Sequence, residues 1–202
     1  MSDSSGTCFL EGLKIIEQAF SLITSENMLL FMKKQDTSPL KVILTKFIQN
    51  STSVEEKISI IEFLTSYARI RSGAEHLWQE NIIKNLGMPA LVNLVNQIDF
   101  YQLEAGDHEP RRNAIHILWC HILLFLRTLN HILMPNSPDY RRTIPAQITA
   151  YWSRLSALLE FGLHLREKQF DAKSISLALY EELELLTGLV SQYFDFADEL
   201  FM

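Results

Sequence analysis

The sequence predicts an all-α fold, an irregular α-solenoid of stacked antiparallel helices. Apolar residues recur at helical spacing from Phe9 to Tyr193, and no segment shows the strict alternation of a half-buried strand. The 202 residues include only seven glycines and six prolines, which favours long helices over a turn-rich β fold. Hydrophobic residues make up 48% of the chain, which is enough for a sizeable core.

Residues 112–134, the most apolar segment, predict the central helix of this fold. At 3.6 residues per turn, one wide side is apolar without interruption: Ala114, Ile115, Leu118, Trp119, Ile122, Phe125, Leu126, Leu129, Ile132 and Leu133. The length also suits a membrane span of about 20 residues. However, Arg127 lies mid-helix among two asparagines and three histidines, and inserting such an arginine costs about 2.5 kcal/mol or more. We therefore expect a helix packed between other helices.

Six helices are expected before this segment, over residues 8–23, 28–32, 39–48, 54–68, 77–86 and 89–98. Pro39 suits the first position of its helix, where no backbone N–H is needed. Ser53 and Glu56 have the spacing of a capping box, in which each side chain accepts a hydrogen bond from the other residue's backbone N–H. Gly73 is expected to mark a break, and Gly87 is expected to end a helix as its C-cap.

Two polar connections flank the central helix in the sequence. The first, near residues 99–111, holds a glycine, four acids and a proline, and we expect it to divide shorter N-terminal helices from longer C-terminal ones. The second is residues 136–143, where Thr143 can cap the next helix, and Asp171 can cap the last one. The helix after Thr143 has an expected buried face of Ile148, Tyr151, Trp152, Leu155, Leu158, Leu159 and Gly162.

A single helical-repeat domain is expected over residues 8–202. Residues 1–7 are small and polar, as in a disordered tail or in residues left from cloning. Residues 195–202 end on apolar side chains, which suits a piece cut from a longer protein and a docked C-terminal tail equally well.

Charge and cysteine content narrow the class of function. The formal net charge is −6 and no basic run exceeds two residues, which argues against a nucleic-acid-binding surface. Cys8 and Cys120 lie in no zinc-binding spacing, and a reduced intracellular compartment suits them best. The pairs Arg111–Arg112 and Arg141–Arg142 are expected to bind nearby acids and a helix C-terminus rather than a ligand.

The histidines predict no metal or catalytic site. His116, His121, His131 and His164 form no pair at helical spacing, so we expect ordinary surface or groove histidines. The Asp-His-Glu run at residues 107–109 is not expected to bind a metal, because three successive loop residues rarely converge on one ion.

No other pattern predicts catalysis or a cofactor, and we expect no enzyme. Glu181, Glu182 and Glu184 suit a solvated helix face. The glycine-rich phosphate-binding motifs and the G-x-S-x-G turn are absent. A serine or cysteine that meets its base only in the folded chain leaves no such pattern, and nothing in the sequence points to one.

One stretch resembles the armadillo type of helical repeat. Gly87–Val95 (GMPALVNLV) is similar to the G-x-x-x-L-V-x-L pattern of these repeats, and the helices expected before it suit the same unit. The resemblance covers about a quarter of the chain and implies stacked helices of the armadillo or HEAT kind.

Further stretches resemble the large scaffold nucleoporins of the nuclear pore inner ring. They are Leu118–His121 (LWCH), Tyr151–Phe161 (YWSRLSALLEF) and Glu182–Ser191 (ELELLTGLVS). The short stretch Gly73–Glu75 (GAE) contributes to the same resemblance. This resemblance spans roughly residues 55–195 and implies a segment from the C-terminal half of such an α-solenoid.

The nucleoporin resemblance implies a structural scaffold or adaptor of the nuclear pore complex at the nuclear envelope, with no enzyme activity. Its partners would be other scaffold nucleoporins, held in part through an amphipathic helix. The residues themselves add neither a nucleic-acid surface nor a membrane span. Two alternatives stay open: a cytosolic armadillo- or HEAT-like adaptor that binds peptides, and a helical domain that binds a lipid or other ligand between its helices.

The last helix carries a candidate partner surface. Its main apolar stripe is expected to be Ile175, Leu179, Leu186, Val190 and Tyr193. Three apolar residues are offset from this stripe, namely Leu185, Leu189 and Phe196. One helix cannot easily bury both sets against a single neighbour, so we expect one set to meet an adjacent repeat or a partner helix.

Trp119 is predicted to be buried in the core, and Trp119→Ala is expected to destabilise the protein by about 3–5 kcal/mol because it removes a large apolar side chain. Urea unfolding of the two proteins measures this difference. A variant that melts at nearly the wild-type temperature would show that the helix of residues 112–134 is not central.

Overall fold

The computed structural model describes residues 4–20, 27, 30, 39–86, 88–97, 114–167 and 177–201. Across these residues every regular element is a helix and no strand occurs, which confirms the all-α prediction. The elements are α1 (Ser4–Phe20), α3 (Pro39–Ile48), α4 (Val54–Ala68), α5 (Arg71–Gln79), α6 (Ile82–Asn85), α7 (Met88–Asn96), α8 (Ala114–Leu133), α9 (Pro138–Arg141), α10 (Ile144–Glu167) and α11 (Leu177–Phe201).

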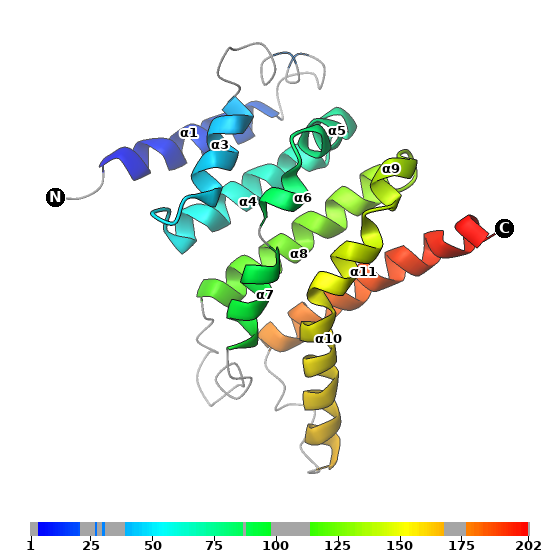
Figure 1. Cartoon of the computed structure of the whole chain (residues 1–202). Helices are drawn as coiled ribbons and strands as arrows, with labels where there is room; N and C mark the ends of the chain where they lie inside the picture. Colours follow the sequence, from blue (N-terminus) through cyan, green and yellow to red (C-terminus); the bar gives the residue numbers. More distant parts are fainter. Residues whose placement is uncertain are drawn as a thin grey trace.

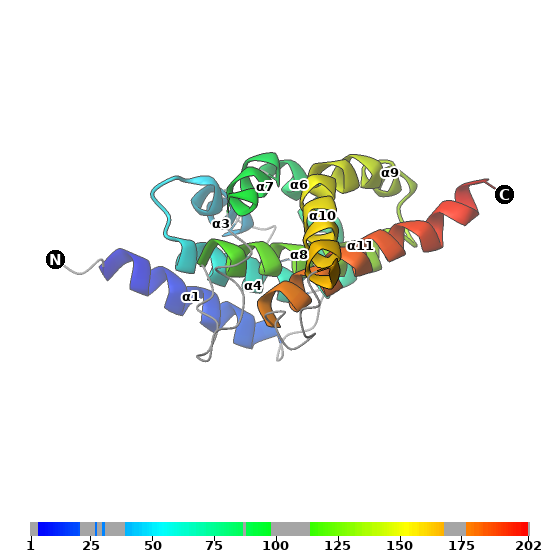
Figure 2. The same ribbon diagram turned by 90° about the horizontal axis from the view of Figure 1, so that it is seen from below.

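Helix α8 is the centre of the described structure. It packs along α4 on one side and along α11 on the other, and it also contacts α5 and α7 (Figure 1). In the view of Figure 2, α1 lies below α4, whereas α3, α6, α7 and α9 lie above α4 and α8. Several α8 side chains are fully buried, including Trp119, Leu123, Phe125, Leu126 and Leu129.

The burial of Trp119 confirms its predicted place in the core. Among the described helices, α8 alone is long and apolar enough to cross a membrane, but half of its apolar window is buried inside the protein. This packing agrees with the expectation of a core helix. The placement of the helices as repeats of a solenoid stays a prediction.

The capping box predicted at Ser53 and Glu56 is confirmed. The Ser53 side chain accepts a hydrogen bond from the Glu56 backbone N–H at 3.2 Å, and the Glu56 carboxylate accepts one from the Ser53 N–H at 3.1 Å. Helix α3 begins at Pro39, and α10 begins directly after Thr143, both as expected. The connection between α8 and α10 also contains the short helix α9, which Ser137 caps by accepting from the Tyr140 N–H.

Gly73 does not mark a break, so that prediction was wrong. The chain bends instead at Arg69 and Ile70, and Gly73 lies inside α5. Here α5 approaches the end of α4 so closely that a Cβ atom at Gly73 would overlap the Tyr67 carbonyl oxygen. The glycine is therefore needed for close packing of two backbones rather than for ending a helix.

The helix expected over residues 77–86 is two helices. Helix α5 begins earlier, at Arg71, and α6 begins at Ile82. Between them Asn81 adopts a left-handed backbone conformation with φ 56° and ψ 38°, which stops one helix before the next begins. Asparagine tolerates this conformation better than most residues.

Three residues expected on the buried face of the helix after Thr143 are exposed, namely Trp152, Leu159 and Gly162. The predicted apolar stripe was therefore too wide. Helix α1 also differs in its bounds from the expected residues 8–23, since small polar residues form its first turn.

Other expectations lie outside the described residues. They are the helix at residues 28–32, of which only residue 30 is described, the Gly87 cap, the connection at 99–111 and the Asp171 cap.

Gly73→Ala is expected to destabilise the protein by about 1–3 kcal/mol, because the added methyl group forces α5 away from α4. Gly12→Ala is the matched control, since nothing lies within 4 Å of a Cβ at Gly12 in α1. That change should stabilise the helix by about 0.5–1 kcal/mol. Urea unfolding of both variants measures the two effects, and equal stabilities would contradict the close approach at Gly73.

Candidate functional site

The Glu182 carboxylate on α11 is fully buried and accepts four hydrogen bonds. Its Oε1 atom accepts from Trp119 Nε1 at 2.7 Å and from Arg154 Nε at 2.7 Å. Its Oε2 atom accepts from His116 Nε2 at 2.8 Å and from Arg154 Nη2 at 3.0 Å. Arg154 also donates from Nη1 to the Val95 carbonyl oxygen at 3.0 Å. All four side chains are at most 1% exposed, and we call them the buried charge network.

The four side chains come from α8, α10 and α11, and the hydrogen bond from Arg154 to Val95 joins α7 to them. His116 and Trp119 are three residues apart on α8, so both side chains project from the same side of that helix toward α11. Arg154 reaches Glu182 from α10 with two parallel N–H groups, the bidentate geometry that suits a carboxylate. Arg154 thus binds α11 through Glu182 and α7 through Val95.

Glu182 was expected on a solvated face and His116 on a surface or groove, and the structure corrects both predictions. A signal was present in the sequence. Glu182 lies at helical spacing between Leu179 and Leu186, which are buried, and this position points a side chain toward the core. A charge inside an apolar stripe indicates a buried partner, but the sequence does not say which residue that partner is.

Ionised Glu182 is favoured inside this network. Burial by itself would raise the pKa of this carboxyl group, but hydrogen bonds from His116 and Arg154 and the Arg154 charge outweigh burial, so the pKa lies below its ordinary value of 4.5. An ionised carboxylate only accepts hydrogen bonds. His116 Nε2 must therefore carry a hydrogen and donate it to Glu182 Oε2.

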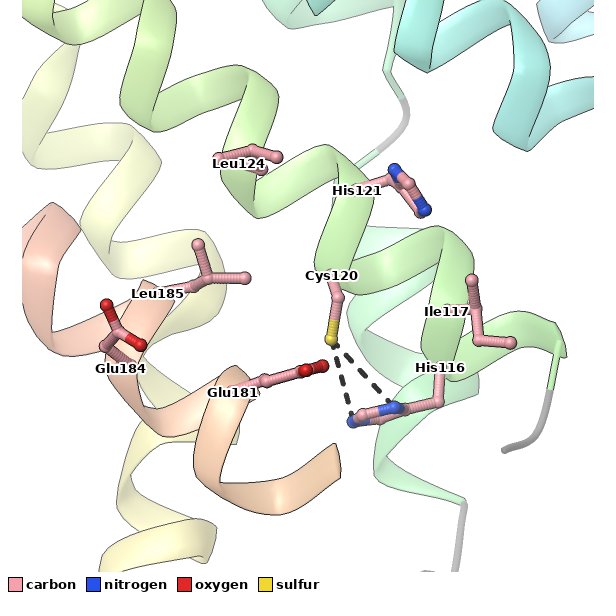
Figure 3. A pocket seen from close by; sticks show the side chains of 8 residues that line it. All are labelled: His116, Ile117, Cys120, His121, Leu124, Glu181, Glu184 and Leu185. Carbon is pink, nitrogen blue, oxygen red and sulfur yellow. Dashed lines mark hydrogen bonds between the residues drawn. The ribbon is translucent and has the colours of Figure 1, made fainter. Parts of the chain in front are cut away.

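An open pocket of about 300 Å³ lies next to the network, between α8 and α11 (Figure 3). It is lined by His116, Ile117, Cys120, His121, Leu124, Glu181, Glu184 and Leu185. The Cys120 sulfur lies 3.9 Å from both ring nitrogens of His116 and takes part in no disulfide. Figure 3 shows the Glu181 carboxylate pointing into the same pocket. His116 thus connects the buried Glu182 with a thiol that faces the pocket.

The three residues of the candidate partner surface lie in different environments. Leu185 is half-buried and lines the pocket, whereas Leu189 is fully buried in the core of this chain. The side chain of Phe196 lies outside the described residues. The use of this set by a partner stays a prediction.

The remaining candidate residues have ordinary structural roles where they are described. Arg142 pairs with Asp139 at 3.0 Å, and Arg141 donates to the Met134 and Pro135 carbonyl oxygens just past the end of α8, which confirms the expected local partners.

The other histidines expected on a surface or groove have different surroundings. His121 lies 3.7 Å from Glu62, and His131 is exposed. The side chain of His164 lies outside the described residues, as do residues 107–109 and Arg111–Arg112. No group of three or more potential metal ligands occurs within the described ranges.

Comparison with known proteins gives no assignment: no family model, no curated protein and no solved structure matches this chain. The resemblance to scaffold nucleoporins therefore stays a prediction.

Glu182→Gln is expected to destabilise the protein by about 3–5 kcal/mol at pH 7, because it leaves the Arg154 charge buried without its partner. The folded-state pKa of Glu182 is lowered, so its ionised form stabilises the fold above about pH 4.5 and this stabilisation is lost as the pH falls further. The difference between wild type and variant should therefore shrink below pH 4.5. Urea unfolding at pH 7 and at several pH values below 4.5 measures it.

The control is Glu184→Gln, two residues along α11, where the carboxylate is exposed beside Arg127. This change should alter the free energy of unfolding by less than about 1 kcal/mol. Equal effects of the two substitutions would contradict the special role of the buried carboxylate.

Proposed function

We propose that this chain is a structural helical segment that holds other proteins on its exposed helix faces, as a scaffold segment of the nuclear pore complex. An apolar stripe on the outer side of α10 is the observation that carries the proposal. Trp152, Leu159 and Leu163 are 53%, 49% and 61% exposed. Their spacing of seven and four residues places them within about 40° of one direction around the helix. We call these three residues the α10 stripe.

Large apolar side chains that gather on one exposed helix face favour a protein–protein contact. In stacked helical repeats such a face is covered by the next helix, and in a complex it is covered by an amphipathic helix of a partner. The last turns of α10 extend past the described helices beside them in Figure 1.

The buried charge network fixes the direction in which the stripe faces. Arg154 is two residues after Trp152, so their side chains project from α10 about 200° apart. Because Arg154 binds Glu182 and Val95 on the inner side, Trp152 must point outward. A tryptophan whose outward direction is fixed in this way suits the role of an anchor in a protein–protein interface. Aromatic residues dominate the binding free energy of many such interfaces.

Replacing the α10 stripe should remove partner binding without unfolding the protein. The variant is Trp152→Glu/Leu159→Glu, because a charge cannot be buried in an apolar contact. The matched control is Ile15→Glu/Ile48→Glu, which alters two equally exposed apolar residues on α1 and α3. Loss of an aromatic anchor is expected to weaken binding by about 30-fold or more.

The measurement is affinity purification from nuclear-envelope extract, with thermal melting to check each fold. Wild type and control should recover inner-ring scaffold nucleoporins, and the stripe variant should not. Recovery of the same nucleoporins by all three proteins would refute the role of the stripe. Recovery of cytosolic proteins alone would instead favour a cytosolic armadillo- or HEAT-like adaptor and refute the pore assignment.

A further inference from the structure

We propose that an open groove beside Lys57 binds a linear monocarboxylate with a short hydrocarbon chain, which is the chemistry of a medium-chain fatty acid. The groove has a volume of about 260 Å³, and we call it the Lys57 groove. Its lining comes from α3, α6 and α7 on one side and from α4 and α8 on the other, the two layers of Figure 2. The proposal is independent of the scaffold role, because none of these lining residues belongs to α10.

Most of the lining is apolar and belongs to the core. Five of the lining side chains are less than a tenth exposed, namely Phe47, Leu86, Leu91, Leu118 and Ile122. Leu94 on α7 lines the same groove and is 47% exposed, so the apolar surface continues from the core to the solvent. A concave, mostly apolar lining with a few polar groups is the usual form of a small-molecule site. It suits a hydrocarbon chain.

Lys57 is the charged side chain of this lining. It is half-buried, and its Nζ atom lies 5.8 Å from the centre of the Phe47 ring. Lys46, the other half-buried lysine in the described part of the chain, pairs with Glu56 at 2.9 Å. No described carboxylate lies within 4 Å of Lys57 in the same way. An ammonium group held partly out of water without a counter-ion costs free energy, and a bound anion offsets that cost.

The other groups around Lys57 also favour an anion. No aspartate or glutamate occurs among the described residues that line the groove. Asn50, in the turn after α3, makes no side-chain hydrogen bond to another described residue, so its amide group can donate to a carboxylate. Asn85 already donates to the Glu80 carbonyl oxygen at 3.2 Å. Lys57 also lies near the start of α4, where the helix dipole is positive.

Size and polarity narrow the class of ligand. The volume equals that of about nine water molecules in the liquid, and octanoate is about this size. A single lysine balances a single negative charge. A peptide would bring backbone N–H and C=O groups that each need a hydrogen-bond partner, and the polar lining offers only two asparagine amides and the lysine. A carboxylate with a plain hydrocarbon chain has no such requirement.

The test is an NMR titration of the full chain, labelled with nitrogen-15, with sodium octanoate. The expected Kd is about 1 mM, a modest affinity for a ligand of this size in an open groove. The largest shifts should fall on amides of residues 47–57 and 90–94. From butanoate to octanoate, each added methylene should tighten binding by up to about fourfold. Octylammonium, which has the same chain and the opposite charge, should bind at least about tenfold more weakly than octanoate.

Two substitutions at position 57 test the lysine. Lys57→Met keeps the length of the side chain and should remove the preference for octanoate over octylammonium. Lys57→Glu should reverse this preference by about fivefold or more, because the new carboxylate attracts the ammonium group. The control is Lys14→Met, which removes an exposed charge from α1 and should leave the preference unchanged. Each comparison is between two ligands on one protein, so a change in stability does not imitate it.

Ala90→Phe tests the groove itself. Ala90 is exposed and lines the groove, so a larger side chain there fills space that the ligand needs without disturbing the core. Octanoate binding should weaken at least about tenfold. Equal binding of octanoate and octylammonium by the wild-type protein would refute the proposal, as would an unchanged preference in Lys57→Glu or shifts centred on other helices.

Discussion

The ion pair between Arg154 and Glu182 is the interaction on which the packing of α7, α8, α10 and α11 depends. Moving a charged group out of water costs several kcal/mol, and attraction between the two charges offsets this cost only when nearly every hydrogen bond is made. Here each carboxylate oxygen accepts two hydrogen bonds, and Arg154 adds a third contact to Val95. The pair is therefore tolerated only in one arrangement of the four helices.

Directional bonds matter here because α8 is apolar over most of its circumference. Apolar packing is non-directional, so a helix of this kind gains almost as much from several rotations about its axis. Hydrogen bonds from Trp119 and His116 to one carboxylate select a single rotation, in which Leu123 and Phe125 are also fully buried. We interpret the network as the feature that gives this broad apolar helix one register against α11.

The sequence predicted most of the fold for local reasons. Apolar periodicity located the long helices, and the Ser53–Glu56 spacing identified a cap that forms between neighbours in the chain. Gly73 was misinterpreted, because the reason for a glycine there is the approach of a second backbone, which sequence does not record. The buried charge network was missed for the same reason. His116 and Glu182 are 66 residues apart, and only folding brings them together.

The proposed contact surface on α10 also depends on this network. On α10, Arg154 turns the helix so that Trp152 faces outward, and any rotation that exposed Arg154 would bury the stripe. On α8, Glu182 accepts from His116 Nε2 and so fixes that ring. A carboxylate without its arginine would have a higher pKa, and once protonated it could donate to the imidazole instead. Arg154 therefore fixes the rotation of α10 directly and the orientation of His116 through Glu182.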